Sequence, residues 1–254
     1  MAEFDRPSVA ARPGTAAVID QGLRSYMLKV YNYMTIGLVI TGLVAYGAFN
    51  LAVTQSGGQI TGLTQFGTVL FESPLRWVVI LAPLAFVLVL SFGINRLSKT
   101  TVQALFWLFA AAMGASMSNL FLRYTGTSIA STFFITAGMF AAVSLYGYTT
   151  KADLTKMGSI MMMGVIGILI AGVVNIFLAS PALQFAISVI GVVVFVALTA
   201  YDTQRIKADY IDYAYAEGTD EAGKRSVMDA LALYLNFVNI FQFLLSLMGQ
   251  RQSN

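Results

Sequence analysis

Long apolar stretches separated by short polar segments are the dominant pattern of this sequence. The longest, 157–201, contains no Lys, Arg, Asp or Glu, and a helix needs only about 20 apolar residues to cross the hydrocarbon core of a bilayer. Seven stretches predict transmembrane helices, at about 31–54, 77–95, 102–122, 127–148, 157–178, 182–202 and 229–248. The expected fold is an all-α integral membrane protein, a seven-transmembrane-helix bundle in a single domain over 29–250, preceded by an N-terminal tail of residues 1–28.

Proline positions refine this pattern. The fifth and sixth helices are separated only by Ala179-Ser180-Pro181, and Pro181 suits the first turn of a new helix, so a tight hairpin is predicted. Pro83 removes one backbone hydrogen bond inside the second helix and should kink it. On the third helix, Ala110, Gly114 and Ser118 recur every four residues, which in a membrane most often allows close helix packing.

Two connections are long enough to have structure of their own. The 55–76 connection is rich in Gly, Thr and Gln and is expected to be a flexible loop without site chemistry. In 203–227, apolar residues including Ile206 and Tyr210 fall at near-helical spacing, so the sixth helix should continue beyond the membrane as an amphipathic rod. We expect its apolar edge to lie on the lipid headgroups, with docking to a partner as the alternative.

The composition supports a membrane protein. Hydrophobic residues make up 57% of the chain and charged residues 11%, against about 25% charged residues in an ordinary soluble domain. The net charge of +3 does not indicate a nucleic-acid partner, because the basic residues lie in short segments between the apolar stretches. The expected partner is therefore the lipid bilayer.

The basic residues predict the orientation. Three of the 15 lie on one side of the predicted membrane, namely Arg76, Arg123 and Arg251, and the other 12 lie on the opposite side. The positive-inside rule then places the N-terminus in the cytoplasm and, after seven crossings, the C-terminus outside. The alternative is a re-entrant last segment with the C-terminus inside, since Asn236, Asn239 and Gln242 make this helix polar.

The absence of His and Cys excludes several kinds of catalytic and metal-binding site. The chain cannot form the usual zinc site, a Ser-His-Asp triad or a thiol nucleophile, so neither enzymatic activity nor a cofactor is expected. An intramembrane aspartyl protease would need two carboxylates facing one water. Only Asp202 and the more peripheral Asp229 are available for that role.

Asp202 is the strongest functional candidate, because it follows directly on the charge-free stretch and an unpaired carboxylate there is costly. Arg96 follows the second helix on the same predicted side of the membrane and could pair with it. On the last helix, Asp229 and Asn236 are seven residues apart, about 20° from one face and about 10 Å along the axis. The alternative is that Asp202 only bonds Arg205 one turn on and that the amides hold helices together.

Four segments give the chain a family resemblance. They are Lys29-Val30-Tyr31, Ser144-Leu145-Tyr146-Gly147-Tyr148-Thr149-Thr150-Lys151, Tyr201-Asp202-Thr203-Gln204 and Leu233-Tyr234-Leu235-Asn236. In this order, and with seven helices, they resemble the Bax-inhibitor family of membrane proteins, and the bacterial branch in particular. The resemblance extends over about residues 25–249 and implies a location in a bacterial inner membrane, with an internal eukaryotic membrane as the alternative.

The resemblance also implies a function. Family members are pH-sensitive calcium leak channels, and bacterial ones also associate with a membrane-bound ATP-dependent protease. Two aspartates on the last two helices sense pH, and an arginine near the end of the second helix latches the first of them when the channel is closed. Asp202 matches the first aspartate and Arg96 the latch, but Asn236 stands where the second aspartate belongs.

This departure has physical consequences. An amide does not titrate, so the proton that two facing carboxylates would share is lost, and the pH response should move to more acid values. Calcium contact at Asp202 should be weak and transient, because the ion prefers six to eight oxygen ligands with carboxylates among them. Asp229 could replace the missing aspartate only if the last helix slid by two turns. A non-conducting regulator that binds a protease or another membrane complex is the alternative function.

Overall fold

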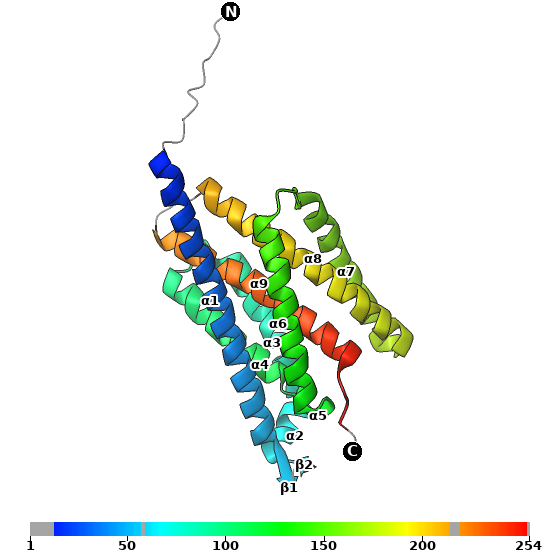
Figure 1. Ribbon diagram of the computed structural model, residues 1–254. Coiled ribbons are helices and arrows are strands. Elements are labelled where there is room, and N and C mark those ends of the chain that lie inside the picture. The colour runs from blue at the N-terminus through cyan, green and yellow to red at the C-terminus, as the bar shows by residue number, and fades with distance from the viewer. Residues whose placement is uncertain (1–12, 57–58, 214–218, 253–254) are drawn as a thin grey trace, which may run out of the picture.

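The computed structural model describes residues 13–56, 59–213 and 219–252. Within these ranges seven helices are long and apolar enough to cross a membrane, which confirms the predicted fold (Figure 1). They are α1 (Pro13–Ala52), α3 (Leu75–Gly93), α4 (Lys99–Met117), α6 (Gly126–Thr149), α7 (Thr155–Leu178), α8 (Pro181–Tyr213) and α9 (Thr219–Met248). The helix α1 begins well before residue 31, so residues 13–28 of the predicted tail are helical.

The α7–α8 connection is the predicted hairpin. Ala179 ends α7 in the left-handed conformation with φ 47°, and α8 starts at Pro181. Asn175 stabilises the turn, since its Oδ1 accepts a hydrogen bond of 3.0 Å from the backbone N–H of Ser180. The second proline, Pro83, lies inside α3, which continues through it to Gly93.

The described residues of the 55–76 connection form regular structure in place of the expected flexible loop, and residues 57–58 lie outside the described ranges. Strands β1 (Val53–Ser56) and β2 (Gln59–Leu63) pair antiparallel, and the short helix α2 (Gln65–Phe71) follows. Thr64 caps α2 by accepting a hydrogen bond from the backbone N–H of Gly67, and its own hydroxyl donates to the carbonyl of Leu51 at 2.7 Å. A hairpin closed by polar residues has too little apolar alternation to be recognised in the sequence.

The predicted extension of the sixth helix is present as far as Tyr213, and residues 214–218 lie outside the described ranges. At the positions closest to the bundle, its apolar edge packs inside the protein and does not lie on the lipid headgroups. Ile206 is fully buried, and the ring of Tyr210 lies 4.9 Å from that of Tyr26 on α1. The extension therefore packs against α1, because the first helix also continues beyond its apolar stretch and offers a surface.

The helix α9 forms the centre of the bundle. It packs on α1, α4, α6 and α8, and its side chains Leu233, Tyr234, Ile240 and Leu245 are buried. It runs without interruption over 30 residues, which is about 45 Å and exceeds the roughly 30 Å of hydrocarbon. The residues after it pair with the connection before α6, where the N–H of Thr125 donates to the carbonyl of Gln250 at 3.0 Å. The structure thus favours a complete crossing over a re-entrant segment, and the start of α1 and the end of α9 lie at opposite ends of the bundle (Figure 1).

The small residues of α4 serve helix packing. A Cβ built on Gly114 would lie 2.6 Å from the carbonyl oxygen of Thr41 and 2.9 Å from Cβ of Val44, so α1 and α4 touch through their backbones at this point. At the periphery, α7 packs on α8 and exposes large apolar side chains such as Ile176 and Phe177. Such a surface is expected where lipid, rather than water, surrounds the helix.

We predict that Gly114→Ala destabilises the protein, because the added methyl group overlaps the backbone of α1. Overpacking of this kind costs about 1–3 kcal/mol. Gly172→Ala on α7 is the matched control, since a Cβ there meets nothing within 4 Å. Thermal unfolding in detergent should show a lower midpoint for Gly114→Ala and an unchanged or higher midpoint for Gly172→Ala. Equal midpoints would contradict the close α1–α4 packing.

Candidate functional site

Asp202 and Asn236 meet across the α8–α9 interface. The side-chain amide of Asn236 donates a hydrogen bond of 2.7 Å to Oδ2 of Asp202. The side chain of Asp202 is 14% exposed and Asn236 is buried. The structure thus places the amide opposite the carboxylate at the distance of a short hydrogen bond.

The cation that pairs with Asp202 is Arg205, one turn further along α8. Its Nε donates to Oδ1 of Asp202 at 3.2 Å. The same guanidinium lies 3.6 Å from a carboxylate oxygen of Asp209 and 3.9 Å from one of Asp229. One arginine therefore faces three carboxylates, two from its own helix and one from α9.

Asp229 is the most deeply buried acid of this group, with a side chain 6% exposed. Its Oδ2 accepts a hydrogen bond of 2.7 Å from the hydroxyl of Tyr26 on α1. Asp229 and Asp202 are thus both in contact with Arg205. The last helix does not have to slide by two turns to bring Asp229 close to the group around Asp202. We call Tyr26, Asp202, Arg205, Asp209, Asp229 and Asn236 the carboxylate cluster.

Arg96, the residue assigned to the latch, lies elsewhere in this conformation. It follows α3, where its backbone N–H bonds the carbonyl of Gly93 at 2.9 Å. Among the ion pairs of the described residues none involves Arg96, and α3 packs on α4 rather than along α8. Topology placed Arg96 and Arg205 on the same side of the membrane, but only the packing of helices decides which one reaches Asp202.

The cluster has more acids than bases. Among the described residues, Arg205 lies within 4 Å of three carboxylates, those of Asp202, Asp209 and Asp229, and Arg225 acts electrostatically on Asp229 as well. Such a surplus in a partly buried site attracts a proton or a cation. In the described part of the chain, however, no three acidic side chains are grouped as metal ligands, and an arginine rather than a water-sized gap separates Asp202 from Asp229.

Three aromatic side chains, which we call the plug, lie together in the core. Phe106, Phe109 and Tyr234 are fully buried, and the two phenylalanine rings meet Tyr234 edge-on at 6.1 and 5.2 Å between centroids. The hydroxyl of Tyr234 lies 2.6 Å from that of Thr41, which is also 2.8 Å from the carbonyl oxygen of Ala110. The plug therefore joins α1, α4 and α9 two residues from Asn236.

Part of this site was recognisable in the sequence and part was missed. Asp202, Arg205 and Asp209 follow one face of α8 at spacings of three and four, which is a signal for such a cluster. Nothing comparable marks Tyr26, because it lies on the first helix, 203 residues from the acid that it bonds.

We predict that the two arginines differ in their effect on stability. Arg205→Gln removes the guanidinium that bonds Asp202 and lies 3.9 Å from the buried Asp229, and it should cost about 1–3 kcal/mol, the usual loss when a hydrogen bond to a charged group is removed. Arg96→Gln removes the same charge from a position that has no ion pair with a described residue, and it serves as the control. Thermal unfolding in detergent should show a lower midpoint for Arg205→Gln only. A larger loss in Arg96→Gln would mean that Arg96 carries the structural ion pair.

Comparison with known proteins places the chain in a family. A family model described as "Inhibitor of apoptosis-promoting Bax1" matches residues 23–253. An uncharacterized protein of Caulobacter vibrioides is 44% identical, with 98% of each chain covered. The inner membrane protein YbhL of Escherichia coli is also 44% identical, over 91% of this chain and 94% of that protein. These matches cover the whole seven-helix bundle, and the chain therefore belongs to the Bax inhibitor family of multi-pass membrane proteins.

Proposed function

We propose that this protein is a pH-sensitive cation leak pathway, with calcium as the permeant ion and the carboxylate cluster as its gate. The observation that carries the proposal is the surplus of acids around Arg205, joined to three helices. Tyr26 ties α1 to Asp229, and Asn236 ties α9 to Asp202 on α8. A proton or a cation that competes with these contacts loosens three helices at once.

The described conformation fits the closed state of such a pathway. Both oxygens of Asp202 have partners, Asn236 and Arg205, and the aromatic rings around Tyr234, two residues from Asn236 on α9, are fully buried. Protonation of Asp202 removes the charge that holds Arg205, so the contact weakens as the pH falls. In this proposal Arg205 takes the role of latch in the closed state, and calcium meets Asp202 only transiently after the contact has opened.

Calcium flux into liposomes tests this proposal. Liposomes with the purified protein should take up more calcium than empty liposomes, and uptake should rise as the pH falls. Asp202→Asn should change the uptake and flatten its dependence on pH, because the titrating carboxylate is gone while the amide keeps the size of the side chain. Equal uptake in all three preparations would contradict the leak.

Asn236→Asp should move the pH response toward neutrality. The new carboxylate would face Asp202 at the position of the present 2.7 Å contact, and two acids so close share a proton to higher pH than one acid beside an amide. The same liposome assay, repeated across pH, measures the midpoint of the response. Asn239→Asp on the same helix is the matched control, because Asn239 bonds the carbonyl of Leu235 and not an acid. A midpoint that moves equally in both variants, or in neither, would contradict the pairing.

The second candidate function is a non-conducting regulator of a membrane-bound ATP-dependent protease. It is supported by the helical extensions of α8 and α9, which carry acidic and basic side chains past the apolar stretches. The two functions differ in a clear way. A regulator would co-purify with the protease from native membranes and show no calcium uptake at any pH.

A further inference from the structure

The helices α1 and α6 flank an open seam on one side of the bundle. In the described residues α1 packs on α4, α8 and α9, and α6 packs on α8 and α9, but the two do not pack along each other. Figure 1 shows them side by side with α9 behind. Two cavities follow this seam, of about 470 and 440 Å³, and both have the size of ligand sites, which is about 300–1,000 Å³.

The first cavity lies near the start of α1 and the end of α6. Its lining includes Arg24 and Tyr31 from α1 and Ser144 and Tyr148 from α6. The hydroxyl of Ser144 is buried and has no hydrogen-bond partner within the described ranges. Buried polar groups are nearly always paired in native proteins, so Ser144 has an unused hydrogen bond at the wall of this cavity.

The mouth of this cavity is positively charged. Arg24 is exposed and takes part in no ion pair with a described residue. Lys207 reaches the same place from α8, where its ammonium group donates to the backbone carbonyl of Tyr148 at 2.9 Å and lies 4.9 Å from that ring. Arg24 therefore lines the cavity and Lys207 lies next to it at Tyr148, and neither has a carboxylate partner among the described residues.

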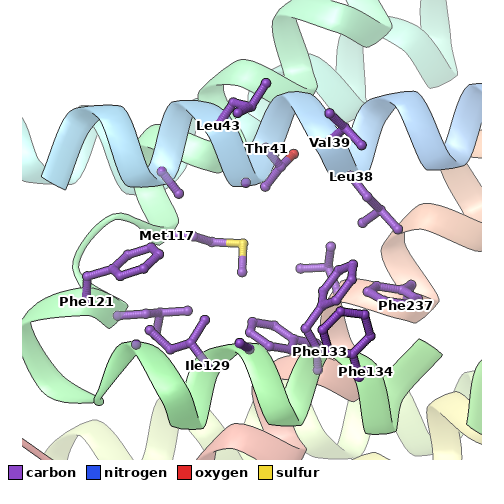
Figure 2. A pocket seen from close by; sticks show the side chains of 17 residues that line it. Leu38, Val39, Thr41, Leu43, Met117, Phe121, Ile129, Phe133, Phe134 and Phe237 are labelled. Atoms are coloured by element: carbon purple, nitrogen blue, oxygen red, sulfur yellow. The ribbon is translucent and has the colours of Figure 1, made fainter. Parts of the chain in front are cut away.

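The second cavity is apolar. In Figure 2, Leu38 and Val39 of α1 and Ile129 and Phe133 of α6 surround it, and Phe237 of α9 lies at its side. Thr41 brings a hydroxyl, but this group is already bonded within the bundle. The expected occupant of this cavity is a hydrocarbon chain.

The two cavities follow one another along α1 and α6, an arrangement that suits one elongated molecule. On α6, Gly138 lies between them on the face that carries Phe134 and Ala141, and a Cβ built on it meets nothing within 4 Å. An acyl chain spans half of the hydrocarbon core, about 15 Å, or about ten residues of helix. A chain that enters the bilayer at Tyr31 thus reaches Thr41 in the second cavity.

We propose that the seam between α1 and α6 binds an anionic phospholipid. Its phosphate lies at Arg24 and Lys207, its polar linkage meets Ser144, and one acyl chain fills the seam as far as the second cavity. Basic pockets between transmembrane helices are known to favour anionic headgroups, and tyrosines such as Tyr31 and Tyr148 are typical of the level where headgroup meets hydrocarbon. The lipid would complete the packing of α1, the helix that carries Tyr26 to the carboxylate cluster.

Lipid retention tests this proposal without any measurement of ion flux, so its outcome is independent of the leak function. The protein is purified in a mild detergent, and its bound lipid is extracted and identified by mass spectrometry. The wild type should retain phosphatidylglycerol or another anionic phospholipid, enriched over the membrane from which it came. No enrichment, a retained lipid without phosphate, or a second copy of the chain in the seam would overturn the proposal.

Three variants locate the lipid. Arg24→Gln should weaken binding of phosphatidylglycerol about tenfold, the value of a charge-assisted hydrogen bond. Gly138→Leu should block the seam and lose most of the lipid, whereas Gly172→Leu, a control that also adds its side chain to open space, should retain it. Added phosphatidylglycerol should raise the unfolding midpoint of the wild type and of Gly172→Leu more than that of the other two. Equal retention by Gly138→Leu and Gly172→Leu would overturn the proposal.

Discussion

The contact of Arg205 with acids from two helices is the interaction on which the rest of the site depends. A carboxylate in the bundle is tolerated only if a cation or hydrogen-bond donors meet it, and Asp229 with a side chain 6% exposed meets both in Arg205 and Tyr26. This requirement fixes the rotation of α8 and α9 about their axes and brings the start of α1 against them. The extended, partly charged ends of these helices are thus part of the folded bundle.

The bundle is unevenly packed around its central helix. On one side, Gly114 lets α4 approach the backbone of α1, and the plug around Tyr234 is fully buried. On the other side, α1 and α6 leave the seam open to the lipid. The helix α1 is therefore closely packed against α4 on one face and borders open cavities beside α6 on the other. In our proposals, the closely packed face holds the carboxylate cluster and a phospholipid of the surrounding membrane fills the open face.

The structure adds to what the sequence indicates about Asn236, where the family resemblance implies an aspartate. The sequence indicates the loss of one half of a titrating pair at Asn236. The structure shows a further acid two turns away on the same helix, Asp229, which lies 3.9 Å from the arginine that pairs with Asp202. The number of acids in the cluster is therefore larger than the motif alone suggests, and their coupling passes through Arg205 rather than through direct contact.

The sequence by itself determined the seven helices, the hairpin at Pro181 and the position of Asp202 at the end of a charge-free stretch, because helix length, proline geometry and charge distribution are local properties. It also indicated Asn236, since a seven-residue spacing places side chains on one face. It could not choose between Arg96 and Arg205, find Tyr26, or show the hairpin of β1 and β2 and the seam beside α6. Those features depend on which helices lie next to each other and how each is rotated, and this is decided by the packing of all helices around α9.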